Sequence, residues 1–313
     1  MGECLEVTTF GACHAHKTPA KAEHGYELTR CLLLRGIDCS GGFVDSADAM
    51  LLAGTEADVR SRIDAVRGAM GRTPVAVGRA RAATSTIVLG PAADERRERV
   101  SVYLEGNDRI QRKRAHVVVC ELLRRNGLAA AVAYRDLHYP SRTDSRKPMV
   151  IVAIGFGTQI AAALRALHRL REWPLITVQT VSICKRDGDV VDGLRPVVSH
   201  AERGMAPWNR LTIYTESSAR HQGQPLHRAL LSRLHAVGVI GAVTLRGAGG
   251  FVAELSALGE LQLSRQVPLV TMVVDTTAHI ARTFDAVEEC TARHGLVTNE
   301  ALSGVPSGIW PEL

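Results

Sequence analysis

Aromatic residues are scarce in this sequence, and long apolar runs are absent. Phe, Tyr and Trp make up 4% of the 313 residues, although hydrophobic residues make up 46%. The cores must therefore be built mainly from Leu, Val, Ile and Ala. No apolar run approaches the ~20 residues that a helix needs to cross a bilayer. Residues 1–4 lack the basic region and apolar core of a secretory signal.

Paired cysteines and familiar catalytic motifs are absent as well. The seven cysteines are odd in number and scattered along the chain, which predicts a reducing, cytoplasmic environment rather than a disulfide framework. The sequence has no Gly-x-Ser-x-Gly elbow, no Walker loop, no His-Glu-x-x-His helix and no Rossmann fingerprint. We therefore expect a protein that is not an enzyme.

The sequence does contain one strand-and-helix unit that is repeated three times. In each copy, an alternating strand is followed by a helix that ends at a glycine; these glycines are Gly36, Gly127 and Gly238. A second helix carries apolar residues at i, i+4 and i+7; these are Val59/Ile63/Val66, Ile160/Leu164/Leu167 and Ile280/Phe284/Val287. A short apolar strand then begins at Val75, Leu175 or Leu296.

Each copy predicts the order βαββαβ, the ferredoxin-like plait, and hence an α+β fold. The units span residues 1–79, 99–184 and 210–302; polar linkers span 80–98 and 185–209, and a tail spans 303–313. From the helix-ending glycine to the second helix, the distance grows from 23 to 33 and 42 residues. The connection between the second and third strands is therefore the variable part, where function is expected.

Positive charge is concentrated in the middle unit. Residues 99–186 carry 16 basic and 6 acidic side chains, a net charge of +10, within a chain whose net charge is +6. The basic clusters are Arg112-Lys113-Arg114, Arg124-Arg125 and Arg142/Arg146/Lys147. Such runs are typical of solvated surfaces, but clustered positive charge also attracts phosphate-bearing ligands.

The C-terminal unit resembles a known family. Segments 211–214, 220–226, 244–251, 268–275 and 295–298 read LTIY, RHQGQPL, TLRGAGGF, PLVTMVVD and GLVT. They are similar to the PII-like family called domain of unknown function 190, and the other two units look like diverged copies. The resemblance implies plaits that assemble as trimers, with nucleotides bound between subunits and a long loop that docks on a target, often a membrane transporter. Three fused units would then form an intrachain pseudo-trimer.

Two segments of the C-terminal unit are candidate ligand-binding sites. Glycines let backbone N–H groups approach an anion, and arginine adds a bidentate donor. The start of a helix offers further free N–H groups. The first candidate comprises Arg246, Gly247, Gly249 and Gly250, and the second comprises Arg220, His221 and Gly223. A flexible loop and an exposed polar loop are the competing interpretations.

We expect a regulatory protein that binds an anionic small molecule, a nucleotide by class, in a cleft between units. The ligand would bias the loop at 247–266 and so affect a partner, for which a membrane transport protein is the candidate. One alternative is a module that binds nucleic acid or anionic lipid through the middle unit. Another is a metal-responsive plait that uses Cys13, His14 and His16, which are plausible ligands for zinc or copper.

Overall fold

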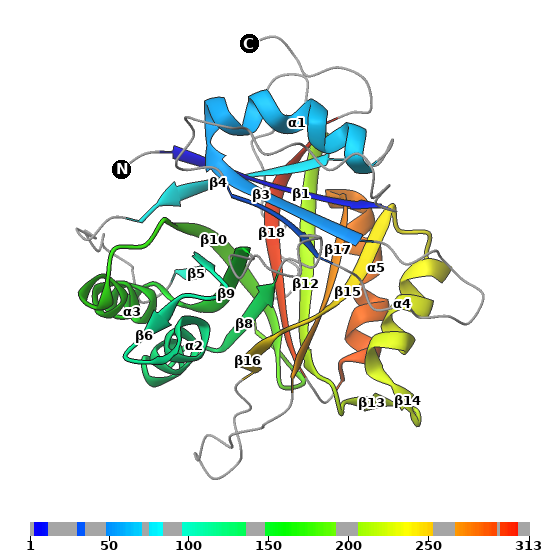
Figure 1. Ribbon diagram of the computed structural model, residues 1–313. Coiled ribbons are helices and arrows are strands. Elements are labelled where there is room, and N and C mark those ends of the chain that lie inside the picture. Colours follow the sequence, from blue (N-terminus) through cyan, green and yellow to red (C-terminus); the bar gives the residue numbers. More distant parts are fainter. Residues whose placement is uncertain are drawn as a thin grey trace.

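The computed structural model describes residues 3–11, 30–34, 48–70, 75–83, 96–135, 148–191, 206–252, 267–292 and 295–305. Figure 1 shows strands in the middle of the molecule and helices on the outside. The order and pairing of these elements divide the chain into three parts, called here the N-terminal, middle and C-terminal units. The strands pair antiparallel beside five described helices, which confirms the predicted α+β class.

The N-terminal unit has four strands and one described helix. Its first strand lies between the third and the fourth, and its second strand pairs with the other edge of the third. The elements are β1 (Glu3–Gly11), β2 (Arg30–Leu34), β3 (Asp48–Thr55), α1 (Glu56–Met70) and β4 (Val75–Ala82).

The middle unit has the same strand order, with its fourth, first, third and second long strands side by side. Its main elements are β5 (Arg97–Glu105), α2 (Ala115–Arg125), β8 (Ala130–Arg135), β9 (Pro148–Phe156), α3 (Gly157–Leu170) and β10 (Leu175–Arg186). Short strands are β6 (Arg109–Ile110), β7 (Lys113–Arg114) and β11 (Asp189–Val190).

The C-terminal unit repeats this order once more. Its main elements are β12 (Ala206–Glu216), α4 (Leu226–Ala236), β15 (Gly241–Arg246), β17 (Pro268–Thr276), α5 (Thr277–Cys290) and β18 (Leu296–Val305). Short strands are β13 (Arg220–His221), β14 (Gln224–Pro225) and β16 (Gly249–Val252). The predicted first residues of the three last strands, Val75, Leu175 and Leu296, are confirmed.

The predicted helix before Gly36 is wrong, because residues Arg30–Leu34 form β2. This segment is a short apolar run, whose periodicity cannot separate a strand from a helix. Its backbone pairs with β3 from Arg30↔Ala53 to Leu34↔Ala49. Leu32 and Leu34 are buried in the core. In the other two units the helix-ending glycines are confirmed, with left-handed φ values of 77° at Gly127 and 74° at Gly238.

Pairing between strands far apart in the sequence lengthens β4, β12 and β18 into segments for which the sequence predicts linkers or a tail. β4 continues to Ala82, which pairs with Thr177 of β10. β12 begins at Ala206, which pairs with Gly304 of β18. These contacts join distant parts of the chain, so they leave no local pattern in the sequence.

The last strands of the three units pair with one another in a closed triangle. β4 pairs with β10, β10 pairs with β18 and β18 pairs with β4. A fourth link is formed by β16, which leaves the C-terminal unit and pairs with β8 of the middle unit. All long strands thus belong to one continuous network of hydrogen-bonded strands.

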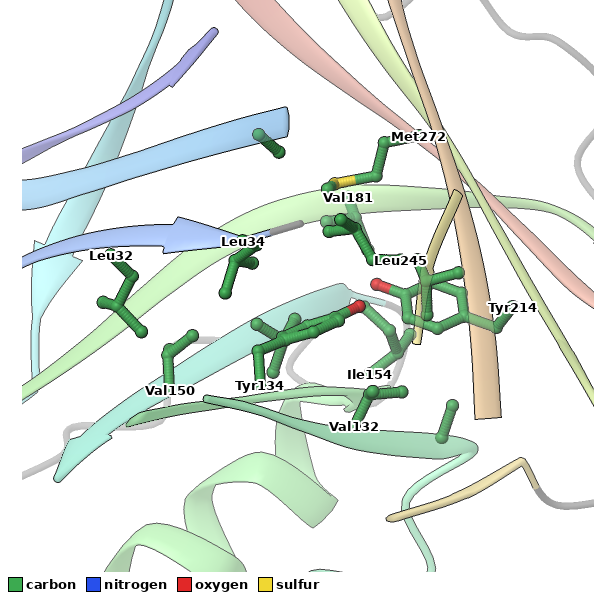
Figure 2. Packing of buried hydrophobic residues seen from close by; sticks show 14 of the residues in the cluster. Leu32, Leu34, Val132, Tyr134, Val150, Ile154, Val181, Tyr214, Leu245 and Met272 are labelled. Carbon is green, nitrogen blue, oxygen red and sulfur yellow. The ribbon is translucent and has the colours of Figure 1, made fainter. Parts of the chain in front are cut away.

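A central core is shared by all three units. It contains Leu34 from the N-terminal unit, Tyr134 from the middle unit, and Tyr214 and Met272 from the C-terminal unit. Figure 2 shows Tyr134 and Tyr214 pointing toward one another between the strands. Separate apolar clusters fill the space between sheet and helices in the middle and C-terminal units. The inner faces of the three sheets therefore bury one another.

Gly250 is the position that allows β16 to lie against β8. Its φ of 136° belongs to a region that only glycine adopts freely, and a Cβ there would lie 2.1 Å from the Ala131 carbonyl oxygen. Gly250→Ala should therefore separate β16 from β8 at a cost of about 1–3 kcal/mol. Faster amide hydrogen exchange along β8, at Ala130–Arg135, is the expected result.

Gly249→Ala is the matched control, since a Cβ at Gly249 would meet nothing closer than 3.9 Å and its φ is ordinary. Equal exchange rates in the two variants would contradict this account of Gly250.

Candidate functional site

Two hairpins carry the same residues at the same spacing, 111 positions apart. The β6–β7 hairpin begins at Arg109, and His116 follows seven residues later; the β13–β14 hairpin begins at Arg220, and His227 follows at the same distance. Both turns have two successive residues with positive φ, 48° and 67° at Gln111-Arg112 and 48° and 81° at Gln222-Gly223. This pattern is typical of a type I′ turn.

Each hairpin leads directly into a helix whose first turn is positively polarised. Neither α2 nor α4 has a side-chain cap at its start, and neither has an acidic residue in its first turn. The first backbone N–H of each helix donates to the preceding loop, from Ala115 to Asp108 and from Leu226 to Ala219. The next backbone N–H groups of each helix have no acceptor within the helix, so the positive end of the helix is available to an anion.

Arg246 and Arg220, predicted to bind a ligand from separate segments, are both near enough to His227 for their charges to act on it. Burial lowers the pKa of His227, and the charges of Arg228, Arg220 and Arg246 lower it further. Arg220 and Arg246 are exposed. In the middle unit the pKa of His116 is lowered by burial, and then by Arg135 and Arg114. Arg135 ends β8 as Arg246 ends β15.

The predicted glycines lie where the C-terminal unit crosses to the middle unit. The Gly247 N–H donates to the Pro268 oxygen at 3.0 Å, and the Ala248 N–H donates to the Ala133 oxygen at 2.7 Å. Gly249 and Gly250 lie in β16 and pair with Ala133 and Val132 of β8. Part of the segment expected to be a long mobile loop is thus a paired strand, because the edge of β8 supplies its hydrogen bonds.

The other predicted ligands lie apart from this crossing or outside the described residues. Gly223 is exposed, with nothing within 4 Å of an added Cβ. The buried His221 Nε2 has no hydrogen-bond partner within the described ranges. The candidate metal ligands Cys13, His14 and His16 lie outside the described residues. Among the residues that are described, no three His, Cys, Asp or Glu side chains are grouped to hold a metal.

A family model covers the C-terminal unit. Residues 208–303 match DUF190, which is described as "Uncharacterized ACR". The match covers the C-terminal unit, called the DUF190 unit below, and leaves the other two units unmatched. The DUF190 segment runs from β12 to β18 and includes the hairpin, His227, Arg246 and the crossing strand β16.

One solved structure is similar at low identity. The crystal structure of an unknown protein from Galdieria sulphuraria matches with 12% identity and a TM-score of 0.20, over 67% of this chain and 98% of that one. No helix in the described part of the chain is long and apolar enough to cross a membrane.

A buried network of charges joins the DUF190 segment to the other two units. Glu300 on β18 accepts from Arg210 at 2.5 Å and from Arg99 of the middle unit at 3.1 Å. Arg99 also pairs with Glu6 of the N-terminal unit at 2.5 Å. Two arginines and two glutamates are thus removed from water together, so their charges balance. Further hydrogen bonds join Arg99 to Gln179 and Ser101, Glu6 to Thr177, and Arg210 to Thr8.

The charges of this network are stabilised by one another. Burial would raise the pKa of Glu6, but Arg99, Arg210 and the Thr177 hydroxyl outweigh it and hold the pKa below the ordinary value. The stability that Glu6 contributes is therefore present above the ordinary glutamate pKa, and it is lost as pH falls through the lower folded-state pKa. Burial raises the pKa of Tyr103, Tyr134 and Tyr214, so these neighbouring phenols stay neutral.

The network borders a small cavity at the meeting point of the three units. The cavity has a volume of about 30 Å³, which is room for about two water molecules. Glu300 Oε1 is buried and has no hydrogen-bond partner in the described part of the chain. Ordered water is therefore the natural partner for this carboxylate.

Sequence reasoning missed His116, His227 and the charge network, although signals for both were present. The repeated spacing Arg-x-Gln-x-x-x-x-His occurs at Arg109 and at Arg220. Arg99 lies three residues before Val102, and Arg210 lies three residues before Ile213. Val102 and Ile213 are the central apolar residues of the two alternating strands. A charged residue within such a strand is either exposed on one face of the sheet or buried beside an opposite charge. Only the packing of the three units decides between these two cases.

Glu300→Gln should be strongly destabilising, because it leaves two buried arginines with one carboxylate. We expect a loss of about 3–5 kcal/mol in the free energy of unfolding, measured by urea denaturation at pH 7. Glu289→Gln is the control, since Glu289 pairs with Arg233 where both side chains are 48% exposed and should lose less than about 1 kcal/mol. Similar losses in the two variants would contradict the proposed role of the network.

Proposed function

We propose that this protein is a PII-like regulatory protein built from three tandem ferredoxin-like units, which form a pseudo-trimer within one chain. The identical strand order of the three units supports this reading, as does the triangle formed by β4, β10 and β18. DUF190 covers only the C-terminal unit. The other two units are then diverged copies that replace the neighbouring subunits of a trimer.

The protein binds an anionic small molecule, a nucleotide by class, beside Arg246 and Arg220. The observation that carries this proposal is that Arg220 and Arg246 are exposed, come from different elements, and both lower the pKa of His227 at the start of α4. The uncapped start of α4 lies directly before His227. Arginine guanidinium groups and free helix N–H groups together are a favourable environment for a phosphate group.

Binding acts through the segment that follows Arg246. Gly247–Gly250 carry the chain from the DUF190 unit to β8 of the middle unit. A ligand that contacts Arg246 better in one arrangement of this crossing shifts the population toward that arrangement. The crossing then presents a different surface to a partner, for which a membrane transport protein is our candidate. The protein has no catalytic role in this proposal.

A second candidate function is binding of nucleic acid or anionic lipid through the middle unit. Arg112, Lys113 and Arg114 favour it, because all three side chains are exposed and no carboxylate in the described part of the chain pairs with them. A salt titration separates the two candidates. Binding to a phosphate backbone weakens steeply with salt, whereas binding of one nucleotide weakens less.

Arg246→Ala should reduce nucleotide affinity while leaving the unliganded protein as stable as before, because the side chain is exposed. Losing a charged bidentate contact costs about 1.5–3 kcal/mol, roughly tenfold to more than a hundredfold in affinity. The loss of affinity is measured as a smaller rise in melting temperature when ATP or other nucleotides are added. Arg282→Ala, an exposed arginine on α5, is the control. Unchanged nucleotide binding by Arg246→Ala would show that the nucleotide does not bind at Arg246.

The pseudo-trimer should be monomeric in solution. Fusing three units buries within one chain the sheet faces and strand edges that separate subunits would bury by association. Light scattering should therefore give a mass near 33.8 kDa. A stable particle of about 100 kDa, three times that mass, would refute this prediction.

A further inference from the structure

The second edge of β15 is buried, although no described strand pairs with it. Among the described strands, β15 pairs with β17 alone. A strand with one partner leaves its other row of backbone N–H and C=O groups open to pairing. Val243, Thr244 and Leu245 are nevertheless only 3%, 1% and 1% exposed. This edge therefore needs an occupant that the described strands do not supply.

The corresponding edge in the middle unit shows what such an occupant requires. β8 corresponds to β15, so that Ala130–Ala133 match Gly241–Thr244 in the two six-residue strands. The edge of β8 is covered by β16, whose residues Gly249–Val252 read Gly-Gly-Phe-Val. Gly250 lies where no Cβ fits, and Phe251 packs against the apolar cluster of the middle unit. The edge thus accepts a short strand that has glycine at one fixed position and an aromatic residue at the next.

The same four residues occur once more in the sequence, in the connection that follows β2. Residues 41–44, which lie outside the described residues, also read Gly-Gly-Phe-Val. The two copies follow corresponding strands, because β2 and β15 are each the second strand of their unit. The connection after β8, residues 136–147, contains no glycine. The motif is therefore present after two of the three second strands.

The connection that carries the second copy leaves and rejoins the N-terminal unit beside β15. The end of β2 and the start of β3 lie next to the end of β1 in one sheet. Near that end, the Cδ2 of Phe10 lies 3.0 Å from the position of a Cβ on Gly241. Figure 1 shows the end of β1 beside β15. Residues 35–40 and 45–47 flank the motif, and at about 3.3 Å per extended residue they are long enough to bring it to β15.

We propose that Gly41–Val44 dock on the second edge of β15 as β16 docks on β8, so that the N-terminal unit crosses to the C-terminal unit. β8 is not available to this copy of the motif, because β16 already pairs with it. The register of β16 on β8 sets Gly42 opposite Val243 and Phe43 opposite Ala242. The crossing brings the N-terminal unit beside Arg246, the last residue of β15. It does not depend on nucleotide binding there.

Amide hydrogen exchange along β15 in the full chain tests this pairing. Gly42→Ala places a Cβ against the backbone of β15, as Gly250→Ala does at β8. It should speed exchange along Gly241–Arg246 by about tenfold or more and leave β8 unchanged. Gly41→Ala is the matched control, because the corresponding Gly249 has room for a Cβ, and it should exchange as the natural protein does. Urea denaturation checks that both variants are folded.

A pair of introduced cysteines tests the same pairing without a glycine variant. Phe43→Cys together with Ala242→Cys should form a disulfide within one chain on oxidation, because opposed residues of antiparallel strands lie close enough to be bridged. Phe43→Cys together with Ala131→Cys is the control and should not form one. Peptide mapping by mass spectrometry identifies the linkage.

Three outcomes would overturn the proposal. The first is equal exchange along β15 in Gly42→Ala and Gly41→Ala. The second is the absence of the disulfide between positions 43 and 242. The third is a disulfide that joins two chains, which would show that a second copy covers β15. A protein that binds no nucleotide would defeat the proposal made for Arg246 and leave these results unchanged.

Discussion

The assembly of the three units depends on burying charged residues away from bulk water. Glu6, Arg99, Arg210 and Glu300 come from β1, β5, β12 and β18, so every unit contributes to one network. Transferring a single one of these charges into an apolar interior is prohibitive, whereas a balanced and hydrogen-bonded set is tolerated. The network can therefore form only when the three sheets face one another, and it specifies their arrangement more than it adds stability.

The three strand orders are alike, but the residues at matching places differ in ways that the packing explains. The second turn residue is Gly223 in one hairpin and Arg112 in the other, although both have positive φ. Arginine is strained in this conformation, yet it adds charge beside the start of α2. Glycine in the DUF190 unit avoids the strain. The two hairpins thus share one backbone conformation but carry different side chains.

The glycine-rich segment after Arg246 illustrates how one local pattern can have two meanings. Glycines that could cradle an anion also let two strands approach closely. At Gly250 the second meaning is required, because any Cβ would collide with the backbone of β8. In our proposal the arginines Arg220 and Arg246 bind the anion, and the glycine segment connects their unit to the middle unit. The crossing therefore connects the candidate site of the C-terminal unit to the middle unit.

The sequence by itself determined the elements that depend on local periodicity and end signals. Alternating strands, the helices with apolar residues at i, i+4 and i+7, and the glycines at 127 and 238 all follow from contacts within a few residues. The apolar run at Arg30–Leu34 was not determined, because its length fits either a helix or a strand until β3 pairs with it. Only the tertiary structure decided that Arg99 and Arg210 are buried, that the charges of Arg220 and Arg246 both act on His227, and that β16 pairs with a strand of another unit. Each of these depends on desolvation or hydrogen bonding between residues far apart in the chain, and such partners exist only after the units have packed together.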